Sequence, residues 1–268
     1  MRSFYRNWRQ LYGRVTKGFS SDYTKKIAPF SAALSGKAVK LKYSTLFEAC
    51  KNSDLKAVKK LIENGADVNP ENEFEEPPLH EACRKGDLKI VNLLLDAGAE
   101  VNVKEFYGNN PLHMAVESGN LKIVQALIDK GSNINARTYP QESTPLHIAA
   151  RHGNISIMKA LIDSGADVNA KRNDGETPLH QAIQKKHRQA VRFLIIKNAD
   201  TNIEDNYGET PLHKAVEHKD MGSIQELIKA GANRDKKSQN GETPLKLATD
   251  RGYSDIYRLL QSDAKSEE

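Results

Sequence analysis

The sequence predicts an all-helical repeat solenoid, and two observations support this prediction. A phrase of the form Thr-Pro-Leu-His recurs six times at spacings of 33, 34, 33, 33 and 33 residues, starting at Pro77, Asn110, Thr144, Thr177, Thr210 and Thr243. An alanine follows each time, and one period before Ala82 stands another, Ala49. A fixed period of this size is typical of stacked repeats. We therefore expect seven units over residues 44–262, the first and last degenerate.

Each unit is predicted to contain two short helices. Ser, Thr or Asn is a favoured N-cap, and proline is tolerated at the first helical position. The predicted caps are Ser44, Asn110, Thr144, Thr177, Thr210 and Thr243, whereas Pro77 cannot cap. Glycine closes the first helix at Gly86, Gly119 and Gly153, but Lys186 and Lys219 occupy that position later. The second helix ends at Gly65, Gly98, Gly131, Gly165 and Gly231, with Asn198 in unit five.

A short extended stretch and a tight turn should link successive units. Asp174-Gly175 and Asn240-Gly241 are strong hairpin signals. Unit four carries one extra residue within residues 139–143. We therefore expect a hairpin before the first helix of each unit.

The period and the Thr-Pro-Leu-His-x-Ala phrase resemble the ankyrin repeat over about residues 44–262. The resemblance implies a stack with a concave helical face and projecting β-hairpin fingers. It also implies a non-enzymatic function, that of a scaffold or adaptor that binds another protein. Lys246 replaces the motif histidine in the last unit, which suits a terminal cap with a polar outer face.

The residues that could carry other chemistry favour structural roles. The motif histidines, His80, His113, His147, His180 and His213, recur once per unit, so they lie too far apart to share one metal ion. Cys50 and Cys83 also lie one period apart and are expected to be buried free thiols. We expect no metal, cofactor or small-molecule substrate. The basic run from Lys185 to Arg188 lacks interleaved aromatic residues, so nucleic-acid binding is not expected.

Aromatic residues at the hairpin tips are the best candidates for partner binding. They are Phe74, Phe106, Tyr107, Tyr139 and Tyr207, at turns that suit small polar residues. Exposed aromatic side chains are typical anchors of protein interfaces. Acidic residues nearby (Glu71, Glu73, Glu75 and Glu105) suggest a basic, apolar-containing partner segment. The alternative is that each ring packs on the neighbouring hairpin and stiffens the row.

The first 43 residues form a basic extension. They hold ten Lys/Arg and one acid, a charge of +9, while the remaining residues sum to −4. An amphipathic helix is predicted within residues 1–21, and its central residues include Arg6, Trp8, Arg9, Leu11 and Tyr12. This helix could cap unit one, act as a mitochondrial targeting segment, or bind an anionic membrane or an acidic partner; it could also be disordered.

The remaining expectations concern the ends of the chain and its surroundings. Residues 20–43 resemble a linker or an irregular cap, and residues 263–268 form a polar tail. Two cysteines and no apolar signal segment favour a reducing, cytoplasmic location, with mitochondria as the alternative. We expect the protein to be a monomer.

Overall fold

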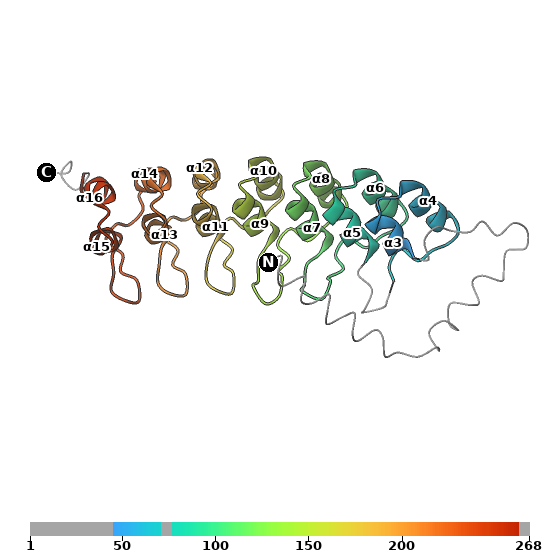
Figure 1. Ribbon diagram of the computed structural model, residues 1–268, viewed down its shortest axis with the longest axis horizontal. Helices are drawn as coiled ribbons and strands as arrows, with labels where there is room; N and C mark the ends of the chain where they lie inside the picture. The colour runs from blue at the N-terminus through green and yellow to red at the C-terminus, as the bar shows by residue number, and fades with distance from the viewer. Residues whose placement is uncertain (1–44, 71–76, 263–268) are drawn as a thin grey trace, which may run out of the picture. The chain divides into compact units, whose positions relative to one another are not determined.

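A computed structural model describes residues 45–70 and 77–262 as a row of paired helices (Figure 1). In these residues fourteen helices and no strands are assigned, which confirms the all-α class. The first helices of units one to seven are α3 (Leu46–Lys51), α5 (Pro78–Lys85), α7 (Pro111–Ser118), α9 (Pro145–His152), α11 (Pro178–Gln184), α13 (Pro211–Glu217) and α15 (Pro244–Asp250). The second helices are α4 (Leu55–Glu63), α6 (Leu88–Asp96), α8 (Leu121–Asp129), α10 (Ile155–Asp163), α12 (Arg188–Ile196), α14 (Met221–Lys229) and α16 (Ser254–Gln261).

Loops project from the side of the row that is opposite the second helices (Figure 1). We call these loops the fingers, and those of units three to seven comprise residues 103–109, 136–143, 170–176, 203–209 and 236–242. A backbone hydrogen bond closes a typical finger at its base, as between Arg172 N and Glu176 O at 2.9 Å. The fingers are therefore hairpin-like turns with too few ladder bonds to count as strands.

The helices begin mostly as the sequence predicts. The α7 helix starts at an asparagine cap, and Asn110 Oδ1 accepts a hydrogen bond from His113 N at 3.1 Å. Unit one corrects the prediction by one residue, because Thr45 rather than Ser44 is its cap, and Thr45 Oγ1 accepts a bond from Glu48 N. Ser44 lies outside the described residues. Pro77 makes no side-chain cap bond, as expected.

Left-handed residues end the helices at the predicted positions. Gly86, Gly119 and Gly153 cap first helices with φ between 67° and 76°. Lys186 and Lys219 adopt the same conformation, with φ of 57° and 53°. Because a side chain makes a positive φ unfavourable, these two lysines mark strained turns in units five and six. The Lys219 ammonium lies 4.2 Å from the centroid of the Tyr253 ring, a contact that partly offsets the strain.

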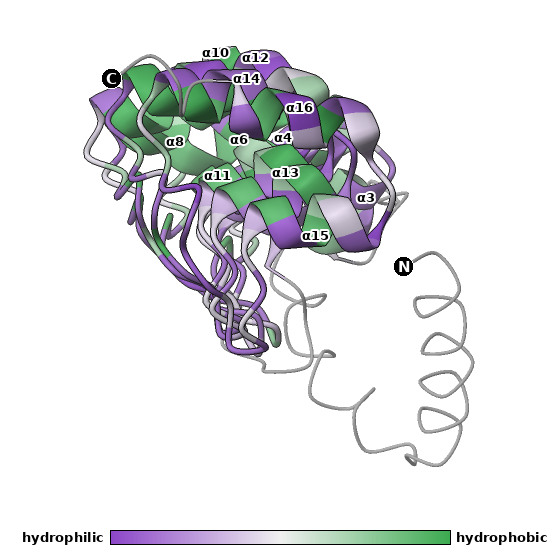
Figure 2. Ribbon diagram, turned by 90° about the vertical axis from the view of Figure 1, so that its left-hand side faces the viewer, coloured by the Kyte–Doolittle hydropathy of each residue, from purple (hydrophilic) through white to green (hydrophobic). Residues whose placement is uncertain are grey.

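The core runs as a continuous layer between the two rows of helices. Its members repeat from unit to unit, as in the motif leucines Leu79, Leu112, Leu146, Leu179 and Leu212, each at most 2% exposed. Figure 2 shows hydrophobic residues on the helices and mostly hydrophilic residues along the fingers. Since one unit cannot bury its own apolar face, stacking supplies the burial. Within the described residues, none of the helices has the length and hydrophobicity that crossing a bilayer requires.

An asparagine ladder also ties successive units together. Asn102 Nδ2 donates to Gly131 O at 3.1 Å, and Asn102 Oδ1 accepts from Asn133 N at 2.7 Å. Asn69 and Asn135 make the same two bonds to the units that follow them. The ladder fixes the register between units at the root of the fingers. The sequence does carry a signal for this ladder, because the asparagine recurs with the period of the repeat at Asn69, Asn102 and Asn135.

Candidate protein-binding surface

The motif histidines are structural, as predicted. In His113, His147, His180 and His213, Nδ1 lies 2.6–2.9 Å from the side chain of the helix cap, and Nε2 lies 3.0–3.4 Å from a backbone oxygen of the next finger. Burial lowers the pKa of His147 to about 3, and those of His113 and His180 to about 4. The three rings are therefore neutral near pH 7. Within the described ranges, no group of three or more His, Cys, Asp or Glu side chains could hold a metal ion.

His80 is the exception in this row. Its Nε2 lies 3.0 Å from Asn109 O, but among the described residues its buried Nδ1 has no hydrogen-bond partner. The cause is Pro77, which has neither the side-chain oxygen nor the backbone N–H that the other caps offer to Nδ1. An unpartnered buried polar atom costs about 1–3 kcal/mol, so unit two is weakened here.

Acidic side chains inside the fingers fix the turns. Glu105 Oε1 accepts hydrogen bonds from Tyr107 N at 3.0 Å and Asn109 N at 3.1 Å. Asp205 Oδ1 does the same for Tyr207 N and Glu209 N. The Glu105 carboxylate is thus engaged within its own finger, and its place in an acidic rim stays a prediction. Glu71, Glu73 and Glu75 lie outside the described residues.

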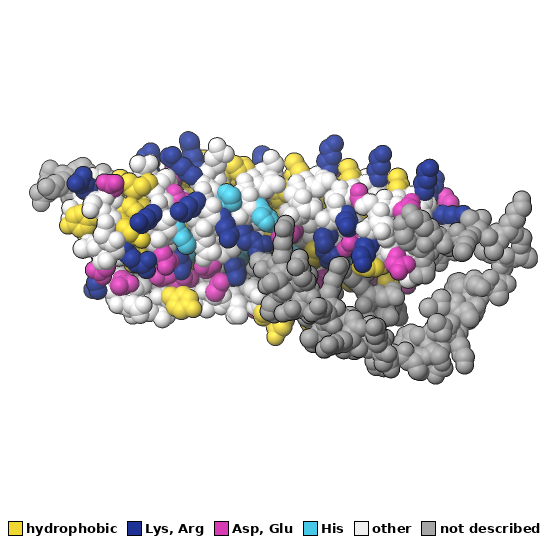
Figure 3. Space-filling model, in the orientation of Figure 1, with side chains coloured by type: hydrophobic (Ala, Val, Ile, Leu, Met, Phe, Trp, Pro, Cys, Tyr) yellow, Lys and Arg dark blue, Asp and Glu magenta, His cyan; other side chains and the backbone are white. Residues whose placement is uncertain are grey.

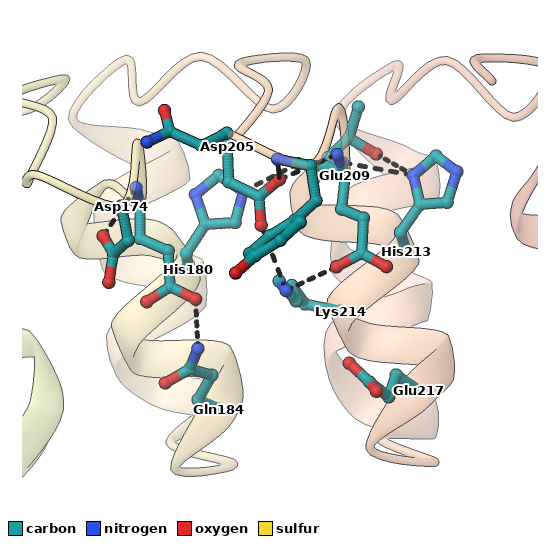
Figure 4. A network of polar contacts seen from close by, with 12 residues as sticks. Asp174, His180, Gln184, Asp205, Glu209, His213, Lys214 and Glu217 are labelled. Carbon is teal, nitrogen blue, oxygen red and sulfur yellow. Dashed lines mark hydrogen bonds and ion pairs between the residues drawn. The ribbon is translucent and has the colours of Figure 1, made fainter. Parts of the chain in front are cut away.

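A buried ion-pair network anchors the finger of unit six (Figure 4). Lys214 Nζ lies 3.0 Å from Asp205 Oδ2 and also donates to Glu209. Burial opposes the charge on Lys214, but its hydrogen bonds with Glu209 and Asp205 outweigh this effect and raise its pKa. The ammonium lies 6.0 Å from the centroid of the Tyr207 ring, which remains 66% exposed. The network holds the base of the finger rigid beneath an exposed ring.

The aromatic candidates divide into exposed and half-buried rings. Phe106 is 80% exposed and Tyr139 is 71% exposed. Tyr107 is half-buried and contacts Phe106 edge-on, with ring centroids 5.1 Å apart. Tyr139 N donates to Tyr107 O at 2.6 Å, so the tips of units three and four lie side by side. Phe74 lies outside the described residues.

In units six and seven, the finger position of Phe106 and Tyr139 holds an amide side chain that links neighbouring fingers. There, Asn206 Nδ2 donates to Asn173 O at 2.8 Å, and Gln239 Nε2 donates to Asn206 O at 2.9 Å. These amides tie each finger to the one before it. Phe106 and Tyr139 lack the side-chain amide that donates this hydrogen bond. Their rings therefore do not link the fingers in this way, and they stay exposed. Comparing the fingers position by position would have revealed this substitution from the sequence.

Basic side chains border the same fingers. Lys104 Nζ, Arg137 Nη1 and Lys171 Nζ each donate to the backbone oxygen of the corresponding residue in the next finger, at 3.4, 2.7 and 2.8 Å. The three residues are exposed. The described surface beside the Phe106 and Tyr139 rings therefore includes basic side chains, of which Arg137 also pairs with Glu142 at 3.4 Å.

The basic run of unit five is partly neutralised. Arg188 Nη2 pairs with Glu226 Oε1 at 2.9 Å, and Lys197, in the same unit, pairs with Asp163 at 2.9 Å. The N-terminal candidates Arg6, Trp8, Arg9, Leu11 and Tyr12 lie outside the described residues.

Comparison with known proteins agrees with the architecture. The family model described as ankyrin repeats (3 copies) matches residues 46–138, 136–205 and 195–267. The crystal structure of the ankyrin repeat domain of Bcl-3, a member of the IkappaB protein family, superposes with a TM-score of 0.70 at 27% identity, covering 81% of this chain and 99% of that one. The human ASB11 ankyrin repeat domain gives a TM-score of 0.73 at 28% identity, covering 82% and 97%. No curated protein matches the sequence. The chain belongs to the ankyrin-repeat family.

Proposed function

We propose that this protein is a non-enzymatic scaffold that binds another protein through the finger tips of units three and four. Phe106, Tyr107 and Tyr139 form the centre of this surface, together with the adjoining concave face. Ankyrin repeats are in general protein–protein interaction modules. Phe74 and Tyr207 would extend the contact toward units two and six.

The exposure of Phe106 and Tyr139 is the observation that carries this proposal. Both rings are more than two-thirds exposed, at positions where Asn206 and Gln239 make a bond that supports the fold. Aromatic residues bury 150–250 Å² each when covered and dominate the energetics of interfaces. The fold has no evident need for aromatic rings at these positions, and this supports a role for them in binding.

The fingers below the rings favour a preorganised surface. Glu105 fixes the tip of unit three through two backbone bonds, and the bond from Tyr139 N to Tyr107 O joins that tip to the next. A rigid surface loses little conformational entropy on binding, which favours affinity. The partner needs an apolar anchor. That the partner segment is also basic stays a prediction, because the same fingers carry the acidic Glu105 and Glu142 as well as the basic Lys104 and Arg137.

An affinity-capture experiment tests the proposal. The full chain, the Phe106→Ala/Tyr139→Ala variant and an Ile196→Ala control are each used to capture proteins from lysate, and captured proteins are then titrated in purified form. Ile196 is 65% exposed on the second helix of unit five, away from the fingers. We expect the double variant to weaken binding by about 1–3 kcal/mol per ring, with its melting temperature unchanged and the control binding normally. Loss of stability with full retention of affinity would contradict the proposal.

We further propose a monomer in a reducing, intracellular compartment. Cys50 and Cys83 support the reducing compartment, because both are buried free thiols. Burial raises the pKa of Cys50 to about 12, and burial also raises that of Cys83, so neither is a reactive thiolate. The alternative of targeting to mitochondria rests on residues 1–43, whose fusion to a reporter tests it directly.

A further inference from the structure

Basic side chains gather at the turns between the first and second helices of units four to six. They are His152 at the end of α9, Lys185 and Lys186 between α11 and α12, and His218 and Lys219 between α13 and α14. His218 is half-buried and the other four are exposed. Figure 3 shows dark-blue and cyan side chains close together on this part of the surface. We call these five residues the basic ridge.

Two lysines of the basic ridge stand where the backbone favours glycine. Lys186 and Lys219 have φ angles of 57° and 53°. Glycine holds the corresponding position in four other units, at Gly86, Gly119, Gly153 and Gly252. A side chain in this left-handed conformation costs roughly 1 kcal/mol, and backbone strain of this kind concentrates at functional sites. The repeat can therefore form without lysine at these turns.

A contact within the protein uses the side chain at this position in units one and six, but not in unit five. Ser53 Oγ donates to Asp87 in the next turn, and the Lys219 ammonium lies 4.2 Å from the centroid of the Tyr253 ring. Among the described residues, the Lys186 side chain has no hydrogen-bond, ion-pair or ring partner. No such contact offsets the strain at Lys186, which points to a partner outside the chain.

The acidic side chains of the same region are engaged elsewhere. Asp220 Oδ1 accepts a hydrogen bond from Ser223 N at 3.2 Å, and its Oδ2 accepts one from Ser223 Oγ at 2.6 Å. Glu117 Oε2 lies 3.0 Å from Arg151 Nη2. In the part of the chain that the structure describes, neither carboxylate pairs with Lys185 or Lys186, so both ammonium groups are available to an external carboxylate.

The turns of the basic ridge are held at a regular spacing. His187 Nε2 lies 3.1 Å from Arg151 O, and this contact links the turn of unit five to that of unit four. Packed helices lie roughly 8–10 Å apart, and an extended chain advances about 3.3 Å per residue. Every third residue of an extended segment would therefore meet the turn of a new unit.

We propose that the basic ridge binds an extended acidic segment of a partner protein. Carboxylates at every third residue of this segment would complement the turns in spacing and in charge. The carboxylates of Glu117 and Asp220 would repel the continuous negative charge of a membrane or of nucleic acid, whereas separate carboxylates can pair between them. Each first helix runs from its finger to its turn, so the ridge lies apart from the finger tips. The proposal goes beyond the scaffold function and does not depend on the aromatic residues of the fingers.

Fluorescence anisotropy of a labelled peptide, Glu-Ser-Ser repeated three times, tests the proposal on the full chain. It is titrated with the wild type, with Lys186→Gly/Lys219→Gly, and with a charge-matched control, Lys229→Gln/Lys237→Gln, whose lysines are exposed. Glycine suits the left-handed backbone, so the first variant removes two charges without harming the fold. We expect it to bind the peptide on the order of 10-fold more weakly, and the control and Lys186→Arg/Lys219→Arg within a few-fold of the wild type.

Carbodiimide crosslinking locates the peptide even where the basic residues 1–43 contribute to binding. The reagent joins peptide carboxylates to lysine amines, and we expect adducts at Lys185, Lys186 and Lys219 but few at Lys229 and Lys237. Equal weakening of the glycine and control variants, equal adducts at the two sets of lysines, equal binding of a Gln-Ser-Ser peptide, or no binding by the wild type would each overturn the proposal. So would binding of phosphatidylserine vesicles or duplex DNA through the ridge in place of the peptide.

The finger variant Phe106→Ala/Tyr139→Ala separates this proposal from that for the finger tips. We expect this variant to bind the acidic peptide as the wild type does. A matching loss of peptide binding would place the peptide on the fingers and contradict a separate site.

Discussion

Replacing Pro77 with threonine should stabilise the protein, because it restores the hydrogen-bond partners that the helix caps of other units offer to the motif histidine. In unit five, Thr177 N lies 3.2 Å and Thr177 Oγ1 lies 2.9 Å from His180 Nδ1. In unit two, His80 Nδ1 is buried and has neither contact. The backbone of Pro77, at φ −58° and ψ 136°, needs only a small shift to reach the −100° and 169° of Thr177.

The expected gain follows from three effects. Partnering a buried polar atom recovers about 1–3 kcal/mol, and a threonine N-cap contributes about 0.5–2 kcal/mol. Removal of proline lowers the free energy of unfolding by about 0.4–1 kcal/mol, because the unfolded chain gains conformational freedom. We therefore expect Pro77→Thr to raise the free energy of unfolding by about 1–3 kcal/mol.

Equilibrium urea unfolding of wild type, Pro77→Thr and Pro77→Ala measures this gain. The alanine variant restores the backbone N–H without the hydroxyl, so it should fall between the other two or match the wild type. Thr177→Ala is the reciprocal test and should lose about 1 kcal/mol. If Pro77→Thr proves no more stable than the wild type, the account of His80 is refuted.

Three further predictions concern turns and titration. Lys186→Gly should raise the free energy of unfolding by about 1 kcal/mol, because glycine adopts the left-handed conformation of residue 186 without strain. Lys219→Gly should raise it less, because this variant also loses the cation–π contact with Tyr253. A lower urea midpoint for Lys186→Gly than for the wild type would contradict this prediction. Gly175→Ala should destabilise the protein more than Gly165→Ala, although both glycines have a positive φ. At position 175 the new Cβ would lie 2.6 Å from the backbone nitrogen of Asn206 in the next finger, whereas at position 165 it would meet no atom within 4 Å. Equal melting temperatures of the two variants would refute this prediction. Burial lowers the pKa of His147 to about 3 in the folded protein, whereas an unfolded histidine has a pKa of about 6.5. Below about pH 6.5 the unfolded chain therefore takes up a proton that the folded protein does not. The free energy of unfolding should fall by up to about 1.4 kcal/mol per pH unit as the pH drops from 6.5 to 5. His147→Gln should show a shallower slope in urea titrations over that range.

Most of the fold could be predicted from local sequence signals. The caps, the closing glycines and the left-handed lysines depend on one residue and its own backbone, so the period locates them directly. Thr45 shows the limit of this approach, because Ser44 and Thr45 both suit a cap by residue type, yet the helix begins at Leu46 with Thr45 as its cap.

The candidate site was predicted less completely. Aromatic residues at turns are visible in the sequence, but exposure depends on the neighbouring finger. Tyr107 is half-buried where Phe106 is not, and Glu105 serves the backbone of its own finger rather than the surface. The network of Lys214 with Asp205 and Glu209 was missed for the same reason, since it depends on how the finger folds over α13.

Photo-crosslinking at the finger tips tests the central claim most directly. A photoreactive phenylalanine analogue replaces Phe106, and separately Ile196, which is 65% exposed at the end of α12 and away from the fingers. Both proteins are irradiated in cells, and crosslinked products are identified. The account predicts specific adducts with another protein at position 106 and few at 196. Equal or absent crosslinking at the two positions, with both variants folded, would contradict it.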